Sequence, residues 1–139
     1  DGAQETFLRD LLARVEEDQT ALKDVIARLG STEDRFKTSA SWLGEKLDRF
    51  KFAHDAEERP DLSDVEELEV LCLSIYGKHT LWRTLAQVLN EDERFADIDF
   101  ERLKNRAQRQ LDDAERFRMQ AALQVFVAPS RSDEQGQSL

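Results

Sequence analysis

A single histidine stands in the middle of the most apolar helix-like stretch of this chain, the segment LCLSIYGKHTLW at residues 71–82. The His79 side chain is the strongest candidate for a chemical site, because a neutral imidazole paired with a carboxylate suits zinc or iron. The same side chain can be a core residue instead, provided that both ring nitrogens find hydrogen-bond partners. Which role applies depends on the residues that the fold brings beside it.

The elements that must position His79 are predicted to be helices. Gly and Pro are scarce, with five and two residues in the whole chain, and apolar residues recur at spacings of three and four, which indicates an all-α protein. Four segments each carry one apolar stripe, so we predict a four-helix bundle in which the stripes bury one another. The helices are expected at about 4–29, 32–54, 64–89 and 99–127, within a single domain at 1–127, followed by a disordered polar tail at 128–139.

Capping residues mark the predicted helix ends. Gly30 suits the left-handed position that follows a helix, and Ser63 with Glu66 forms a capping-box pair at the start of the third helix. Asp97 or Asp99 is expected to cap the fourth helix. The direction of the middle connection stays open, because about ten residues could form a hairpin or, fully stretched, a crossover of about 33 Å.

Three polar residues fall near the inner sides of their helices and close to the middle of each. These are Asp18 on the first helix, His79 on the third and Gln110 on the fourth, placed at about 100° of rotation per residue. We therefore predict a central polar layer of Asp18, His79 and Gln110, in which the carboxylate and the amide satisfy the imidazole. The alternative is a metal site on Asp18 and His79 that holds iron, manganese or zinc.

The composition disfavours several other function classes. A net charge of −10 repels nucleic acid and anionic membrane surfaces, so neither is expected as a partner, and no run is long enough to span a membrane. One cysteine, Cys72, allows no internal disulfide and indicates a reducing, cytoplasmic setting. Because Cys72 lies on the apolar stripe, we expect an inert thiol. Glycine-rich phosphate loops and nucleophile-elbow glycines are absent.

Four helices of this length, with a longer middle connection and polar residues halfway along the core, resemble the ferritin-like superfamily. The resemblance covers about residues 4–127 and is one of architecture. It implies a di-iron site built from a Glu on each of two helices and an E-x-x-H motif on each of the other two. This chain contains no E-x-x-H motif, and His79 stands where the resemblance would place a carboxylate. The iron chemistry of the family is therefore not expected here.

The third predicted helix carries a second apolar stripe, roughly opposite His79. Because a helix that is apolar on two sides needs cover on both, we expect this stripe to form a homodimer interface. The alternative is that the tail, or the loop before the third helix, folds over it. The stripe consists of Val70, Leu73, Gly77, Leu81 and Val88.

Taken together, the residues favour a non-catalytic bundle that acts through protein contacts or by binding a ligand, without a cofactor. The alternative function is a metal-binding or oxidoreductase stress protein of ferritin-like architecture, with an unusual site around Asp18 and His79.

Overall fold

The computed structural model describes residues 2–30 and 60–127, and within these residues the protein is all-α. The predicted helices at 4–29, 64–89 and 99–127 are confirmed, with ends that differ by two residues or fewer. The predicted helix at 32–54 and the predicted tail at 128–139 lie outside the described residues. The elements are α1 (Gly2–Leu29), α3 (Leu62–Val88), the short 3-10 turn η1 (Glu93–Phe95) and α4 (Phe100–Phe126).

Two of the predicted helix ends are confirmed in detail. Gly30 follows α1 with a positive φ of 77°, and its N–H donates to the carbonyl oxygen of Ile26 at 3.1 Å. Glycine adopts this left-handed conformation without the steric cost of a Cβ. Asp99 caps α4, since its carboxylate accepts a hydrogen bond from the backbone N–H of Arg102 at 2.9 Å.

The start of α3 corrects the predicted capping box of Ser63 and Glu66. Asp61 is the N-cap, and its carboxylate accepts from the N–H of Asp64 at 3.1 Å, while the Asp64 carboxylate accepts from the N–H of Asp61 at 2.7 Å. A carboxylate satisfies the free N–H groups as a hydroxyl does and also interacts with the positive end of the helix dipole. The helix therefore begins at Leu62, before the predicted start near Asp64.

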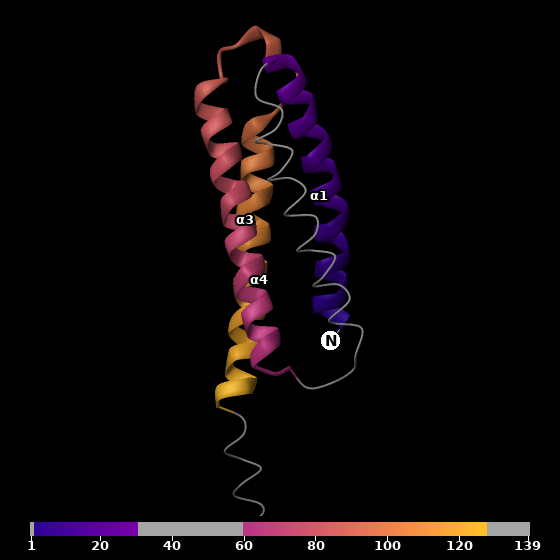
Figure 1. Cartoon of the computed structure of the whole chain (residues 1–139), viewed down its shortest axis with the longest axis vertical. Coiled ribbons are helices and arrows are strands. Elements are labelled where there is room, and N and C mark those ends of the chain that lie inside the picture. Colours follow the sequence, from indigo (N-terminus) through magenta and orange to yellow (C-terminus); the bar gives the residue numbers. More distant parts are fainter. Residues whose placement is uncertain (1, 31–59, 128–139) are drawn as a thin grey trace, which may run out of the picture.

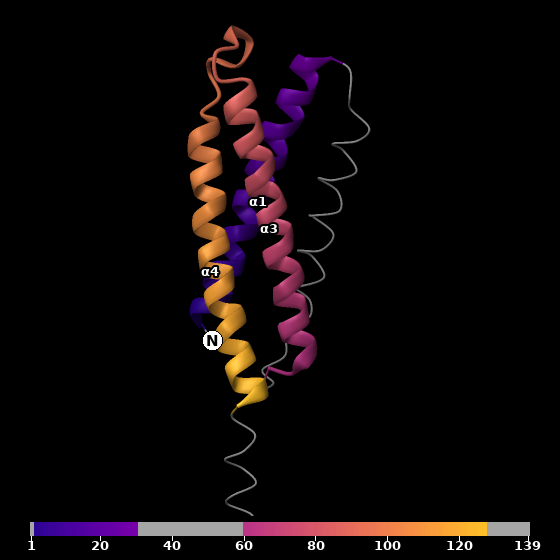
Figure 2. The same ribbon diagram turned by 90° about the vertical axis from the view of Figure 1, so that its left-hand side faces the viewer.

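The helices α1 and α3 run in the same direction, and α4 runs in the opposite direction (Figure 1). α3 and α4 form a closely packed antiparallel hairpin, and α1 lies alongside it and crosses behind both helices in the view of Figure 2. The first half of α1 and of α3 therefore packs against the second half of α4. The start of α1 and the end of α4 lie at the same end of the bundle.

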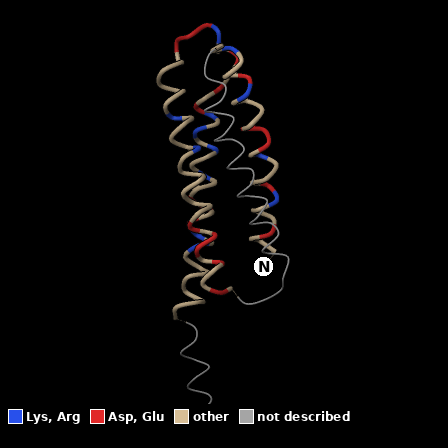
Figure 3. Tube along the Cα trace, viewed as in Figure 1, with Lys and Arg blue, Asp and Glu red and all other residues tan. Residues whose placement is uncertain are grey.

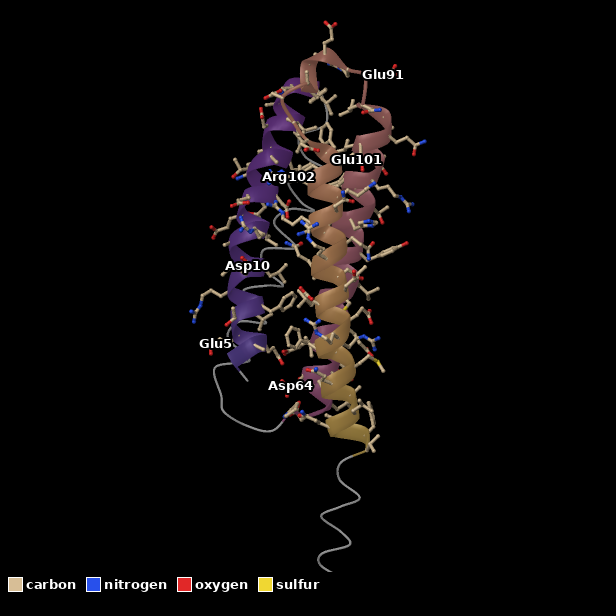
Figure 4. The ribbon with its side chains drawn as sticks, turned by 180° about the vertical axis from the view of Figure 1, so that it is seen from behind. Glu5, Asp10, Asp64, Glu91, Glu101 and Arg102 are labelled. Carbon is tan, nitrogen blue, oxygen red and sulfur yellow. The ribbon has the colours of Figure 1, made fainter. Side chains whose placement is uncertain are left out.

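Charged residues of both signs follow one another along α1 and gather in the loop between α3 and α4 (Figure 3). One of them ties this loop to α1. The Arg28 guanidinium binds the Asp97 carboxylate, with an Nη2 to Oδ2 distance of 2.8 Å, and donates to the carbonyl oxygen of Arg94 at 2.8 Å. The hydrogen bond from Arg28 lowers the pKa of Asp97 to about 2. Other carboxylates, such as Glu5 and Glu91, project away from the bundle (Figure 4).

The core is divided into two apolar clusters, one toward each end of the bundle. Phe7 of α1 packs against Phe117 of α4 in the first, with ring centroids 5.1 Å apart, and Trp82 packs against Phe100 in the second, at 6.2 Å. Buried residues of the first cluster include Leu11, Val15, Leu68, Leu71, Cys72, Ile75, Ala114 and Phe117. Buried residues of the second include Leu22, Val25, Ile26, Trp82, Leu85, Phe95, Leu103 and Ala107.

Candidate functional site

A layer of buried polar side chains separates the two apolar clusters. Asp18 of α1, Lys78 of α3, and Arg106 and Gln110 of α4 are exposed by only 4%, 7%, 9% and 7%. Ionised side chains are rarely buried to this degree unless they are paired. The pairing within the layer therefore determines what it can do.

Lys78 connects the three helices that the structure describes. Its ammonium Nζ lies 2.7 Å from Oδ2 of Asp18 and also donates to Oε1 of Gln110. An ammonium group has three protons to donate and no acceptor, so these two bonds use most of its capacity. Lys78 thus joins a carboxylate on α1 to an amide on α4.

Arg106 occupies the other side of the same carboxylate. Its Nη2 donates to Oδ1 of Asp18 at 2.8 Å, and its Nη1 donates to Oε2 of Glu17 at 2.8 Å. Each oxygen of Asp18 therefore accepts a hydrogen bond from a different cation. Glu17 lies at the rim, with its side chain 52% exposed, and brings a second negative charge to the two cations.

For both cations, burial lowers the pKa and ion pairing raises it. For Lys78 burial is the larger effect, and its pKa is lowered even though Asp18 favours the charged ammonium. For Arg106 burial also acts to lower the pKa, but the bonds and charges of Asp18 and Glu17 together outweigh it, and the pKa is raised. The guanidinium is thus the more firmly charged partner of Asp18.

The spacing of the layer residues follows the apolar stripes on which they lie. Asp18 falls between Val15 and Leu22 on the buried face of α1, at offsets of three and four residues, and Gln110 follows Arg106 by one turn of α4. Lys78 lies seven residues after Leu71 and seven before Leu85, and both leucines are buried. The three helices therefore place these side chains at the same level along the bundle axis.

Of the three residues of the predicted layer, the structure brings Asp18 and Gln110 together, whereas the third, His79, is not part of the layer. Asp18 and Gln110 come together, but Lys78 joins them, and His79 is only half-buried beside the layer. No residue that the structure describes forms a hydrogen bond with the His79 side chain. The buried face of α3 includes Leu71 and Leu85, and these residues move its centre from His79 toward Lys78.

The geometry also argues against a metal site on Asp18 and His79. Both oxygens of Asp18 already bind cationic groups, so a divalent cation there would meet the charges of Lys78 and Arg106 at close range. Over residues 2–30 and 60–127 no cluster of three or more His, Cys, Asp or Glu side chains is placed to hold a metal. The layer is a set of ion pairs with no free carboxylate of its own.

The layer contains more donors than acceptors. Nε of Arg106 and Nε2 of Gln110 are buried and have no acceptor among the described residues, and the same holds for Nε1 of Trp82 in the neighbouring cluster. A general base needs a free acceptor and a nucleophile needs an activating base. The described layer offers neither, so its arrangement supports a structural role that fixes the three helices in register.

The thiol of Cys72 lies in the first apolar cluster, as the sequence predicts. Burial is the main cause that raises its pKa to about 11, and the nearby carboxylate of Glu115 adds to the effect. Because the thiolate is the reactive form, Cys72 is a packing residue in this environment.

The outward side of α3 carries the second apolar stripe only in part. Leu73 and Val88 are exposed by 69% and 70%, whereas Val70 and Leu81 are half-buried, and Leu81 packs against the second apolar cluster. Around Gly77 the space is open, since a Cβ built there would meet no heavy atom within 4 Å.

Sequence reasoning missed one large member of this outward surface. Tyr76 is exposed by 55%, and its position three residues after Leu73 would have placed it on the same side of the helix. Between Glu69 and Arg83 the single charged residue is Lys78, and that side chain points inward. The outward surface of this interval is therefore free of ionised groups.

The described helices contain no segment that is both long and apolar enough to cross a membrane. Comparison of the chain with protein families, with curated proteins and with solved structures finds no match in any of the three.

Proposed function

We propose that the chain is a non-catalytic four-helix bundle that acts through protein contacts, and that it forms a homodimer through the outward surface of α3. The buried layer supplies a fixed register for the helices, and the exposed surface of α3 supplies the contact. The proposal rests on one observation above all, namely the reversal of polarity on α3. Lys78, the charged residue, is inside, whereas Leu73 and Tyr76 are outside.

The directions of the described helices support a simple up-down-up-down path for the bundle. α1 and α3 are parallel, so Gly30 and Pro60 lie at opposite ends of the bundle. A helix at 32–54 would span about 34 Å in that direction. In a ferritin-like path the crossover would make the second and third helices parallel, and α1 and α3 would then be antiparallel. The helix directions therefore favour a bundle without a crossover.

An exposed apolar surface without ionised groups is characteristic of a protein-binding site. Such a surface has little desolvation cost to overcome, because no ionised group has to leave water when a partner covers it. Charged residues make up 36% of the chain, which makes an uncharged interval of this length on an exposed face unusual for this composition. The layer, in contrast, has no surface on which a partner could bind.

The molar mass of the whole chain tests the proposal. Light scattering across a concentration series should give a mass that rises toward twice the 16.1 kDa of one chain. Leu73→Glu should hold the mass at the monomer value, since it places a charge in the contact. Leu123→Glu is the matched control, because Leu123 is an apolar residue of α4 exposed by 56%, and its mass curve should follow the wild type. A wild-type mass that stays monomeric at every concentration would contradict the homodimer.

The alternative, a metal-binding protein with a site at Asp18 and His79, is tested separately. Elemental analysis of protein purified without a chelator would support it only if stoichiometric metal were present and were lost in His79→Ala. The ion pairs of Asp18 with Lys78 and Arg106 lead us to expect no such metal.

A further inference from the structure

The outward side of α3 has the residue spacing of a helix-pairing seam. Exposed or half-exposed side chains recur at alternating intervals of three and four residues along it. This 3-4 repeat keeps one line of side chains facing a second helix, as in a coiled coil. The seam consists of Glu66, Glu69, Leu73, Tyr76, Thr80 and Arg83.

The middle of the seam is uncharged, and the Thr80 hydroxyl within it is satisfied by its own helix. The Thr80 hydroxyl donates to the carbonyl oxygen of Tyr76 at 3.0 Å, which leaves the methyl group of Thr80 free to make apolar contact. Leu73 and Tyr76 are the two large side chains of this middle part, and both are more than half exposed. A partner helix could therefore cover Leu73 and Thr80 without leaving the Thr80 hydroxyl unpaired.

The charges at the two ends of the seam lie at equal distances from its apolar middle and are opposite in sign. Glu66 lies seven residues before Leu73, and Arg83 lies seven residues after Tyr76. Neither forms an ion pair with any residue in the described ranges 2–30 and 60–127. Both are exposed, so each is able to pair with a charge on another molecule.

A second copy of this chain provides that charge when its α3 runs antiparallel. If Leu73 of one copy lies opposite Tyr76 of the other, the equal spacing of seven residues brings Glu66 opposite the second copy's Arg83, and the reverse. A parallel pairing in register would instead set Glu66 against Glu66 and Arg83 against Arg83, which is repulsive. The charge pattern therefore selects both the orientation and the register.

We propose that two copies pair through antiparallel α3 helices, with Leu73 packed on Tyr76 across a twofold axis and with two reciprocal Glu66 to Arg83 ion pairs. This inference rests on the proposed homodimer and adds its orientation and register. A twofold axis is the symmetry in which the same surface contacts itself, so each contact occurs twice.

Charge exchange tests the pairing. Arg83→Glu alone and Glu66→Arg alone should each weaken the dimer by about tenfold, because two exposed ion pairs become repulsive contacts. The double variant Glu66→Arg with Arg83→Glu restores both pairs and should return the dissociation constant to the wild-type value, measured by sedimentation equilibrium. A double variant as weak as the single variants would overturn the pairing. Circular dichroism of each variant verifies that α-helical content is retained.

Cysteine cross-linking tests the register with a second readout. In a Cys72→Ala background, Leu73→Cys and Tyr76→Cys copies of different mass are mixed and oxidised. An antiparallel pair should give the mixed disulfide as the main product, whereas a parallel pair would give disulfides within each variant and would overturn the proposal. Leu123→Cys on α4 serves as the matched control and should stay unlinked.

The two proposals can fail separately. If Leu73→Glu abolishes the dimer but charge exchange has no effect, the homodimer stands and the antiparallel register is wrong. If the wild-type chain is a monomer at all concentrations, both are wrong.

Discussion

The inward and outward sides of α3 invert the usual relation between polarity and burial. Lys78 is charged and 7% exposed, whereas Leu73, a little over one turn away, is apolar and 69% exposed. By the usual burial preferences of the two residue types, the lysine would be exposed and the leucine buried. On the inward side, α1 and α4 supply the carboxylate and the amide that bind Lys78. For the outward side we propose a second copy of the chain.

The two sides also differ in the energy that they contribute. Burying ionised side chains has a desolvation cost that an ion pair only partly offsets, so the layer contributes specificity more than stability. The exposed apolar residues contribute little to the folding of one chain and act only when covered. The layer should therefore respond to substitution through stability and the outward side through association.

Removing the carboxylate of the layer should have the largest effect. Asp18→Ala leaves Lys78 and Arg106 buried without their shared partner, and we expect the free energy of unfolding to fall by about 3–5 kcal/mol. Equilibrium urea unfolding followed by circular dichroism measures it. The control is Glu17→Ala, because Glu17 also binds Arg106 but is half-exposed, and its loss should be below about 1 kcal/mol. Equal losses in the two variants would show that the layer is not a buried ion network.

A thiol on the inward side of α3 should react about two orders of magnitude more slowly than a thiol on the outward side. The pKa of Cys72 is raised from 9.0 to about 11 by burial and Glu115, so at pH 8 its thiolate fraction is about 100-fold below that of an ordinary thiol. Tyr76→Cys in a Cys72→Ala background should react with iodoacetamide at the rate of an exposed thiol. If native Cys72 reacts as fast as that variant, the inward placement of this part of α3 is wrong.

Replacing the layer by apolar residues should preserve stability. Asp18→Leu, Lys78→Met and Arg106→Met together remove the buried charges of residues 2–30 and 60–127, and we expect a free energy of unfolding equal to that of the wild type or up to about 4 kcal/mol higher. The variant should instead populate more than one structure, which would appear as broader amide resonances or as mixed oligomers by native mass spectrometry. A stability far below the wild type, with sharp resonances, would mean that the ion pairs stabilise the fold directly.

The smallest effect is expected for His79. His79→Ala should lower the free energy of unfolding by less than about 1 kcal/mol, because the side chain is half-buried and leaves no buried charge behind. The same urea titration gives the comparison with Asp18→Ala. A loss as large as that of Asp18→Ala would place His79 in the layer after all.

Helices α1, α3 and α4 were predictable from the sequence because their apolar residues recur at helical spacing and their ends carry Gly30 and Asp99. The layer was predictable in position, since Asp18 and Gln110 interrupt apolar stripes halfway along their helices. Its central residue was not. A lysine is assigned to solvent by default, and only the heptad spacing of Leu71, Lys78 and Leu85 indicated that it points inward.

Arg106 was missed for the same reason, although it lies one turn before Gln110 on the buried face of α4. The long apolar stems of Lys and Arg can pack among Leu and Ala side chains while the charged ends reach a carboxylate. Whether such a partner exists depends on another helix, here α1, and no pattern within α3 or α4 contains that information.

The shared direction of α1 and α3 leaves the start of α1 and the end of α4 at one end of the bundle. In an antiparallel pair of α3 helices the second copy would be turned end over end, so its own α1 start and α4 end would lie at the far side. The 27 residues of α3 correspond to about 40 Å, and the assembly would be a two-ended rod of roughly that length. Any protein joined to either end of the chain would then be held apart from its twin, and the dimer would act as a molecular spacer.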